Sequence, residues 1–331
     1  MKVIEICTYA APAIYILLTI TAIISLYSPL LSQLASHGKT RIVISNDPKE
    51  NEKETPRAAK STSHVTTAIM IRLRLLDHDR FQIRKHHFVH FYTVGITWAA
   101  FILWNHHQRH QSRRNNVTTC TLLLYLHLAR RCYECRYVHI WNGSMHIAGF
   151  ALGLLHYILL PFIFLGNGIE IQHHHGHGHD HGHGHLYLIM GVVINLFSQY
   201  EQHLHHCILA NYRKNGVKEI NGGKRYSIPH GRWFAYVSCP HYLAEIMIYA
   251  SFAILLHHQY DFGIANGAGT DSFLVQSAIS LCSSVQPFKH VILVAWVAIN
   301  LAISARSSHA WYQKQFPGYP KHRTALIPFL W

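Results

Sequence analysis

Four stretches of the sequence carry polar side chains at helical spacing, and these side chains are of types that bind ligands and move protons. Residues three or four positions apart lie on one face of a helix. The four faces are formed by Arg130, Arg131 and Glu134; by Asn195, Gln199, Gln202, His203 and His206; by His241 and Glu245; and by Ser308 or His309 with Tyr312. Carboxylates, imidazoles and phenols are the groups that act in acid–base catalysis. The alternative for any single residue is a polar contact between packed helices.

Basic residues stand close to these faces in the sequence. The segment before His241 contains Arg213, Lys214, Lys224, Arg225 and Tyr226, and the terminal "YPKHRTALIPFLW" adds Lys321 and Arg323. The helix that opens near His241 would also direct its amide dipoles toward an anion. This combination favours a phosphorylated ligand. Lys321 and Arg323 have an alternative role, as charges beside a membrane that fix the orientation of the chain.

A third feature, "HHHGHGHDHGHGH" at 173–185, has eight histidines in thirteen positions and suggests metal binding. A metal transporter would also need ligands at mid-depth in the neighbouring apolar segments, and "MHIAGFALGLLHYILLPFIFL" offers only His146 and His156. Ordering a flexible His/Gly segment around an ion also costs conformational entropy. We therefore expect a low-complexity insertion and no functional metal site, and keep a His-rich metal-binding or metal-transporting membrane protein as the alternative from another class.

Apolar segments must position these residues, because the chain is 50% hydrophobic and only 13% charged. Runs of about the length that crosses a bilayer, roughly 17 to 25 helical residues, occur near 7–27, 88–104, 117–130, 145–165, 186–202, 242–258 and 287–305. The third is short and contains His127. The sequence thus predicts an all-α integral membrane protein with a bundle of about seven transmembrane helices, as a single domain over 1–331.

The distribution of Lys and Arg predicts the orientation of this bundle. With a lumenal N-terminus and a cytosolic C-terminus, the cytosolic segments 28–87, 131–144, 203–241 and 306–331 contain eleven, two, six and four Lys/Arg. The four polar faces then all lie at the cytosolic ends of their helices and form one pocket. Residues 45–64 would be a mobile cytosolic loop, and the His-rich loop 166–185 would lie in the lumen. No zinc-finger or RNA-binding motif accompanies the basic residues, so nucleic acid is not an expected partner.

Longer motifs resemble a known family. "YSIPHGRWFAYVSCPHYLAEIMIY" and "SSHAWYQKQFPGYPKHRTALIPFLW" resemble the steroid 5α-reductase family, and "LARRCYECRYVHIW" and "QYEQHLHHCILANYRKN" look like its polyprenol (polyprenal) reductase branch. The resemblance covers 186–331 best, extends over 127–165, and is thinner before that. It implies an NADPH-dependent reductase of a polyisoprenoid lipid, in the endoplasmic reticulum membrane, that supplies dolichol for protein N-glycosylation. A steroid or enoyl-lipid reductase of the same family is the alternative.

The resemblance also implies which residues bind the cofactor, with the family's cofactor region at 186–331. It assigns NADPH contacts to Asn195, Arg213, Tyr226, Glu245 and Tyr312, with His309 close by and with Lys321 and Arg323 near the phosphates. His241 stands where many relatives have Asn, which puts one cofactor hydrogen bond in doubt. Gln199 stands where steroid-reducing members have Asp, which fits the polyprenol branch. Leu128 falls near the position of the tyrosine that steroid reductases use on the substrate carbonyl.

Chemistry narrows the substrate to an aldehyde. Hydride adds to a carbon–carbon double bond when the developing negative charge can be delocalised, which the carbonyl of polyprenal allows and an allylic alcohol does not. Hydride would reach C3, charge would develop on the aldehyde oxygen, and a proton would arrive at C2. This requires a hydrogen-bond donor at the oxygen and a proton source. Tyr133 and Glu134 are the candidates, with Tyr92 in reserve; Glu134 could instead pair with Arg131.

Overall fold

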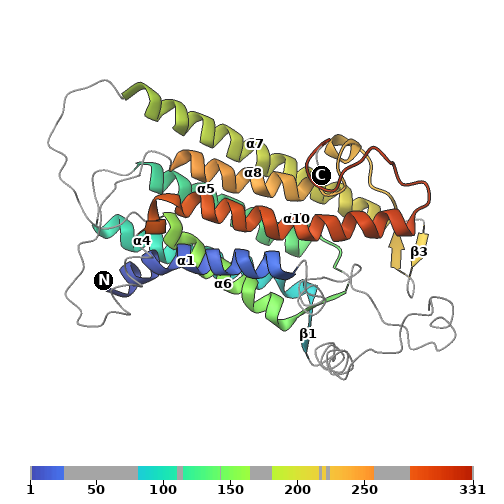
Figure 1. The fold of residues 1–331 in the computed structure, drawn as a ribbon, viewed down its shortest axis with the longest axis horizontal. Helices are drawn as coiled ribbons and strands as arrows, with labels where there is room; N and C mark the ends of the chain where they lie inside the picture. Colours follow the sequence, from blue (N-terminus) through green and yellow to red (C-terminus); the bar gives the residue numbers. More distant parts are fainter. Residues whose placement is uncertain are drawn as a thin grey trace, which may run out of the picture.

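Apolar runs separated by polar segments form α-helices in the computed structural model, which describes residues 2–25, 81–109, 115–141, 143–164, 181–215, 218–220, 224–256 and 284–329. These ranges contain seven α-helices, which form one bundle (Figure 1). Their bounds are α1 Lys2–Ser25, α4 Val89–Arg109, α5 Asn115–Tyr133, α6 Ile147–Phe164, α7 His181–Lys214, α8 Pro240–Leu255 and α10 Lys289–Gln315. Each helix overlaps one predicted span, so the helical fold class is confirmed.

Three of the helices are long and apolar enough to cross a membrane by themselves, over Cys7–Ile24, Ile147–Phe164 and within Gln286–Gln315. This identifies a multi-pass membrane protein. α8 is apolar but shorter, whereas α5 and α7 carry many of the polar residues that the sequence placed on faces. The number of spans and the orientation of the termini stay predictions. Segment 45–64 and residues 166–180 lie outside the described residues, and α7 begins at His181, inside the predicted lumenal loop.

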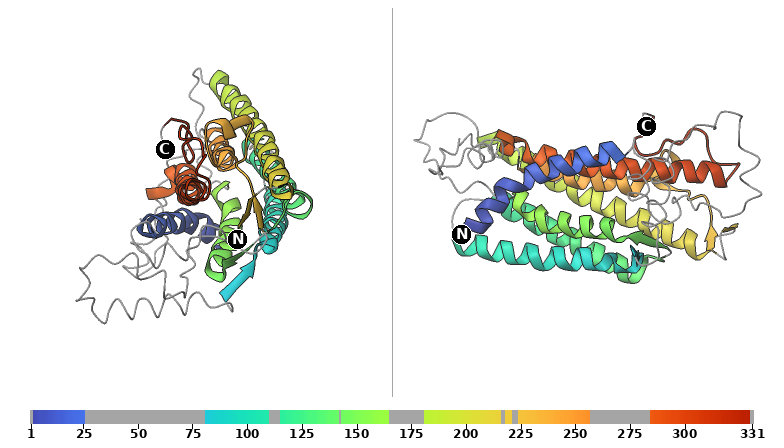
Figure 2. Two further views of the ribbon diagram at one scale, coloured as in Figure 1. Left: turned by 90° about the vertical axis from the view of Figure 1, so that its right-hand side faces the viewer. Right: turned by 60° about the horizontal axis from the view of Figure 1, so that its bottom comes forward.

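Short strands and turns cluster at one end of the bundle, which we call the strand end (Figures 1 and 2). β1 Gln82–Arg84 pairs antiparallel with β2 Ser144–His146, and β3 Lys218–Ile220 pairs antiparallel with β4 Lys224–Tyr226. The short helical segments in the described ranges are η3 Lys85–Phe88, the π-helical turn η4 Glu134–Val138, η5 Arg232–Ala235 and η7 Gln286–Phe288. Because successive helices alternate in direction, α5, α7 and α10 end at the strand end and α8 begins there (Figure 1).

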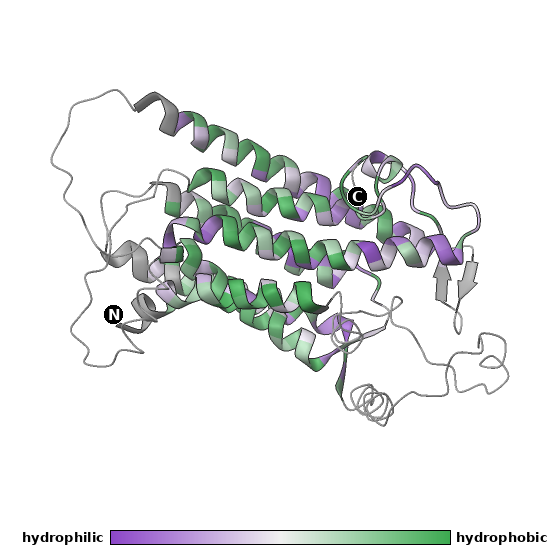
Figure 3. Ribbon diagram, in the orientation of Figure 1, coloured by the Kyte–Doolittle hydropathy of each residue, from purple (hydrophilic) through white to green (hydrophobic). Residues whose placement is uncertain are grey.

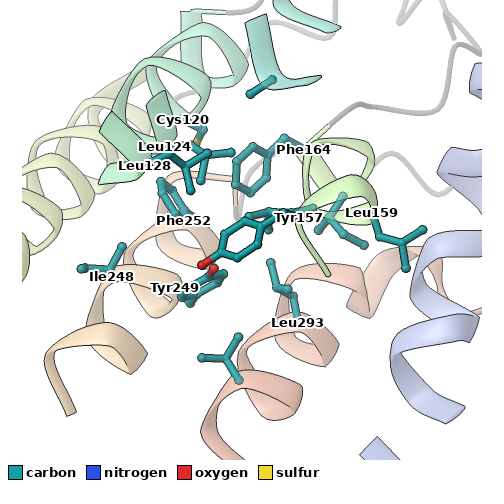
Figure 4. Packing of buried hydrophobic residues seen from close by; sticks show 14 of the residues in the cluster. Cys120, Leu124, Leu128, Tyr157, Leu159, Phe164, Ile248, Tyr249, Phe252 and Leu293 are labelled. Carbon is teal, nitrogen blue, oxygen red and sulfur yellow. The ribbon is translucent and has the colours of Figure 1, made fainter. Parts of the chain in front are cut away.

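The core lies between α5, α6, α8 and α10, where large apolar side chains interdigitate (Figure 4). Leu124, Leu160, Ile248 and Phe252 are among its fully buried members. Close packing of this kind leaves little room to add atoms without displacing neighbours. The core therefore fixes the rotation of each helix, and with it the direction of the polar side chains near the strand end.

α7 and α8 pack side by side, and a glycine sets how closely they approach. A Cβ atom on Gly191 would lie 2.4 Å from Cγ of Leu255 and 3.2 Å from the backbone oxygen of Ser251. One turn further along α7, Nδ2 of Asn195 donates to Oγ of Ser251 at 2.8 Å. Hydrogen bonds between helices in a bilayer contribute about 1–2 kcal/mol. The glycine thus allows the contact that holds Asn195 in place.

We predict that Gly191→Ala separates α7 from α8 and destabilises the protein, because the added methyl group has no space. Overpacking of this kind costs about 1–3 kcal/mol. The measurement is the Tm of the purified protein in detergent, which we expect to fall. Gly318→Ala is the control, since a Cβ there meets nothing within 4 Å. Equal Tm values for both variants would contradict the close approach described here.

Candidate active site

The predicted polar faces come together at the strand end. Hydrophilic residues gather there, whereas the middle of the bundle is hydrophobic (Figure 3). α5 and η4 contribute the first face, α7 the second and α8 the third, and the C-terminal part of α10 carries the fourth. The side chains of the first three faces form one hydrogen-bonded network, centred on two carboxylates.

Glu134 is the first of these carboxylates and is fully buried. Its Oε1 accepts hydrogen bonds from Arg130 and from Nδ1 of His203, which lies at 2.8 Å. Its Oε2 accepts from Arg131 and from Nδ1 of His206, at 2.7 Å. π-helical turns are frequent at functional sites, and η4 places Glu134 inward, directly after α5 ends. Four donors from α5 and α7 therefore converge on one carboxylate.

The charge state of Glu134 follows from these partners. Burial alone would raise the pKa of its carboxyl, but His206, Arg131 and Arg130 outweigh burial and hold the pKa well below its usual range. In the same cluster, burial together with His206 and Arg131 lowers the pKa of His139, so its ring is neutral. Glu134 is thus an ionised acceptor that orients the two arginines.

Within the described ranges, one group of side chains is arranged as metal ligands would be, and Arg131 lies among them. Ligand atoms of Glu134, His139 and His206 lie within 4.8 Å of one another. However, Nη1 of Arg131 lies 3.2 Å from Nε2 of His139 and 2.9 Å from Nδ1 of His206, and it donates to Glu134. A guanidinium cation already fills the centre of the group. Its Nη2 donates to the Tyr92 hydroxyl at 2.9 Å, which links α4 to the network.

Glu245 is the second carboxylate and lies on α8. Nε2 of Gln202 donates to Glu245, and Nε2 of His127 lies 3.3 Å from its other oxygen. Oε1 of Gln202 accepts from Arg130, which also donates to Glu134. Gln202 therefore connects the two carboxylates through a single amide, and Arg130 connects α5 to α7. The second and third predicted faces meet here.

Two buried polar atoms, one on α7 and one on α8, have no hydrogen-bond partner in the described ranges. Gln199 donates to Oδ1 of Asn195 at 2.7 Å, but its own Oε1 has no hydrogen-bond partner in the described part of the chain. Nδ1 of His241 is also buried and also has no hydrogen-bond partner in the described ranges. Leaving a buried polar group unpaired costs about 1–3 kcal/mol. Such atoms are expected where a polar ligand supplies the missing partner.

The C-terminal segment closes over the start of α8. Backbone bonds join Ser238 and Cys239 to Thr324 and Ala325, and Thr324 to Tyr236. Oγ of Ser238 lies 2.6 Å from both Nδ1 of His309 and the Tyr319 hydroxyl. These bonds place the fourth face, on α10, against the residues that precede His241.

Arg323 and Tyr312 are buried in this C-terminal region. Nη1 of Arg323 donates to the Pro229 carbonyl at 2.9 Å, and its Nη2 lies 3.1 Å from Nδ1 of His230. The Tyr312 ring stacks on Tyr319 at 5.5 Å. Arg323 therefore fastens the C-terminal segment to the loop before η5, and its Nε has no hydrogen-bond partner in the described ranges.

The other predicted site residues make no hydrogen bond to either carboxylate in the described part of the chain. Tyr133 is 54% exposed and packs on Tyr137. Nη1 of Arg213 donates to the Ile140 carbonyl at 2.9 Å. The remaining positions are Tyr226 against Trp311, a half-buried Ser308 and an exposed Lys321.

Several members of the network were not among the predicted site residues. Arg130, Arg131 and Gln202 were on predicted faces but had no assigned role. His127 only made its span look weak, although a histidine inside an apolar span is itself a signal of function. Ser238 carried no sequence signal, because its partners His309 and Tyr319 are distant in the chain.

The chain is similar in sequence to a known family and to several proteins of known activity. A family model described as 3-oxo-5-alpha-steroid 4-dehydrogenase matches residues 147–266 and 275–331. The polyprenal reductase of Xenopus laevis is 30% identical over 277 residues, which cover 76% of this chain and 78% of that protein. The polyprenal reductase of Homo sapiens is 29% identical over 280 residues, with the same coverage. That of Danio rerio is 26% identical over 276 residues, or 76% of this chain and 80% of the relative.

The family model covers the helices that carry Glu245, Gln199 and His309, and the relatives extend the similarity over about three quarters of the chain. The resemblance seen in the sequence motifs is therefore confirmed. The chain belongs to the 3-oxo-5-alpha-steroid 4-dehydrogenase family, the steroid 5α-reductases, and is a membrane oxidoreductase.

Proposed function

We propose that this protein uses NADPH to reduce the α-isoprene double bond of polyprenal to dolichal in the endoplasmic reticulum membrane, and that a separate reduction of this aldehyde then gives the dolichol used in protein N-glycosylation. The observation that carries the proposal is the similarity to polyprenal reductases over 76% of the chain. The balanced reaction converts polyprenal, NADPH and one proton into dolichal and NADP⁺.

The residues at the strand end have chemistry that suits a nicotinamide dinucleotide. The unpaired Oε1 of Gln199 and Nδ1 of His241 fit the donor and acceptor of a carboxamide, beside Asn195 and Glu245. Phosphates would be held by cationic or hydroxyl side chains, for which the candidates are Arg213, Ser308, His309, Lys321 and Arg323. Tyr226 and Tyr312 offer aromatic faces. When bound, NADPH supplies the hydride that C3 of the substrate receives.

The substrate chemistry assigns roles to the residues around Arg131. Tyr92 accepts a hydrogen bond from Arg131 and keeps its own hydrogen to donate to the aldehyde oxygen. Glu134 would have to be protonated to act as an acid, but its partners keep it ionised, so we propose that it positions Arg130 and Arg131. Tyr133 remains a candidate donor, at an exposed position on the rim.

A helical bundle also suits a polyisoprenoid substrate. The tail of such a lipid has many apolar units, and these stay in the bilayer at no desolvation cost while the aldehyde reaches the network. α7 presents apolar side chains outward along its length, among them Ile189, Val193 and Phe197. The membrane itself therefore takes the place of a deep lipid-binding cavity.

The proposed substrate can be tested with the purified protein. Purified protein in detergent with NADPH should form dolichal from a short polyprenal and leave the corresponding polyprenol unchanged, because only the aldehyde delocalises the developing charge. Mass spectrometry of both reactions gives the result. Steroid enones and enoyl lipids are run in parallel, and turnover of these without turnover of polyprenal would favour the alternative functions within the family.

The proposed role of Glu245 in cofactor binding can be tested by substitution. Glu245→Gln should weaken NADPH binding about 10- to 100-fold, since hydrogen bonds to a charged group contribute about 1.5–3 kcal/mol and each 1.4 kcal/mol is tenfold. The measurement is a direct titration of NADPH. Glu201→Gln is the matched control, because Glu201 is a buried carboxylate on α7 that pairs with Arg232 outside the network. Equal loss in both variants would argue against a cofactor role for Glu245.

The ionised state of Glu134 should make the stability of the protein depend on pH. Because the pKa of folded Glu134 is depressed, its ion pairs stabilise the protein above the ordinary carboxyl pKa of 4.5 and are lost as the pH falls toward the folded value. Glu134→Gln should cost about 3–5 kcal/mol at pH 7, as expected when one partner of a buried ion pair is removed. Tm measured against pH should show the gap between wild type and variant narrowing only below about pH 4.5. A constant gap down to the acid limit would be inconsistent with an ionised Glu134.

A further inference from the structure

Three tyrosines from three helices converge one turn deeper in the bundle than Glu245. Tyr92 comes from α4, Tyr157 from α6 and Tyr249 from α8, and all three are buried. The rings of Tyr92 and Tyr157 meet edge to face, with centroids 5.4 Å apart. The hydroxyl groups of Tyr157 and Tyr249 point toward one another (Figure 4). Three phenol groups in an otherwise apolar core are unusual, and packing alone does not require their oxygens.

Tyr249 is supported by a chain of hydrogen bonds. Its hydroxyl lies 2.9 Å from Nε2 of His156, and Nδ1 of His156 lies 3.1 Å from the Tyr15 hydroxyl. The Tyr15 hydroxyl also lies 3.1 Å from the backbone oxygen of His156, and its one hydrogen can go to either acceptor. When it goes to Nδ1, the ring hydrogen is on Nε2 and His156 donates to the Tyr249 oxygen. The hydrogen of Tyr249 is then free for a ligand. This arrangement links α1, α6 and α8 through a single imidazole.

The Tyr157 ring is buried and its hydroxyl makes no hydrogen bond within the described part of the chain, but this oxygen is not one of the fully enclosed unpaired polar atoms there. A Cβ on Gly95 would lie 3.2 Å from Cδ1 of Tyr157, so the glycine leaves the space in which the ring sits. The hydroxyl is therefore accessible, and a ligand oxygen between Tyr157 and Tyr249 would accept its hydrogen bond.

We infer that Tyr157 and Tyr249 are catalytic residues that donate hydrogen bonds to the carbonyl oxygen of the substrate aldehyde, and that His156 positions Tyr249 for this role. The inference rests on the proposed function and adds to it a two-helix oxyanion site beside Tyr92. Tyr249 lies one helical turn after Glu245, and its ring contacts His127 edge to face at 6.5 Å. The oxygen would therefore bind next to the residues proposed to hold the cofactor.

The electron flow shows what the two hydroxyls stabilise. As C3 gains hydride, the C2–C3 π pair becomes the C1–C2 π bond and the carbonyl π pair moves onto oxygen. Preorganised donors at that oxygen lower the barrier because the charge forms there. The carbonyl then forms again as C2 takes a proton from the medium. Neither tyrosine changes its own protonation state in this scheme.

The test is a comparison of Tyr157→Phe, Tyr249→Phe and wild type, with Tyr125→Phe as a control because Tyr125 is a half-exposed tyrosine on α5 that makes no hydrogen bond in the described ranges. We expect kcat for polyprenal to fall about 10²- to 10³-fold in the first two variants, as for loss of an oxyanion donor. NADPH affinity and the activity of the control should be unchanged. Tm should fall somewhat in Tyr249→Phe, which loses the bond to His156, and change little in Tyr157→Phe. The primary isotope effect with deuterated NADPH should rise, because hydride transfer becomes slower.

A second measurement does not depend on turnover. The carbonyl stretch of ¹³C-labelled polyprenal bound to wild type with NADP⁺ should lie at lower frequency than in detergent alone, and should return toward the detergent value in Tyr249→Phe. Wild-type turnover of polyprenal with both phenylalanine variants within about threefold of wild type, or an unshifted stretch in bound wild type, would overturn the oxyanion site and leave the proposed function intact. Wild type that fails to reduce polyprenal would overturn both.

Discussion

A carboxylate buried as deeply as Glu134 can remain charged only when donors surround it, and this requirement organises the strand end. Arg130 and Arg131 come from the last turn of α5, directly before it, but two arginines beside one carboxylate leave donors to satisfy. Gln202, from α7, and Tyr92, from α4, accept these donors. The rotations of three helices are thus coupled to the ionisation of one side chain. A bilayer strengthens the coupling, because lipid offers no alternative partners to polar groups at depth.

The same requirement explains why only some helices look like membrane spans. α1, α6 and α10 are apolar enough by themselves, whereas α5 and α7 carry the network. Apolar run length nevertheless located all seven described helices in the sequence, because the runs and the polar faces repeat with the same helical period. The sequence also predicted that the four polar faces lie at one end of the bundle, because successive helices alternate in direction. The hydrogen bonds between side chains of different helices could not be predicted, because the spacing of residues within one helix carries no information about the neighbouring helix.

The tyrosines show this limit most clearly. Tyr157 and Tyr249 lie in strongly apolar segments, where a tyrosine is expected to be a large packing residue. The neighbouring His156 was considered only as one of two histidines, too few for a metal pathway. Their hydroxyls become informative once α6 and α8 are placed side by side. Gln199 and His241 behave differently: both depart from the family pattern in sequence, and both have a buried atom without a partner in the described ranges. A departure and an unpaired atom at the same position point to a ligand more strongly than either does alone.

Depth in the bundle connects these two sets of residues. The charged network at the strand end suits a water-soluble, multiply anionic cofactor, and the tyrosine cluster one turn deeper suits the neutral head of a lipid. A hydride can pass only between atoms in contact, so the reacting carbon must lie where the two environments meet. α8 spans that boundary within two turns, from His241 through Glu245 to Tyr249. Since one rigid helix carries residues of both sets, a shift of α8 would change cofactor binding and carbonyl polarisation together. Close packing of Gly191 on α7 against Ser251 and Leu255 on α8 resists such a shift, which makes the stability of the α7–α8 contact part of the chemistry that we propose.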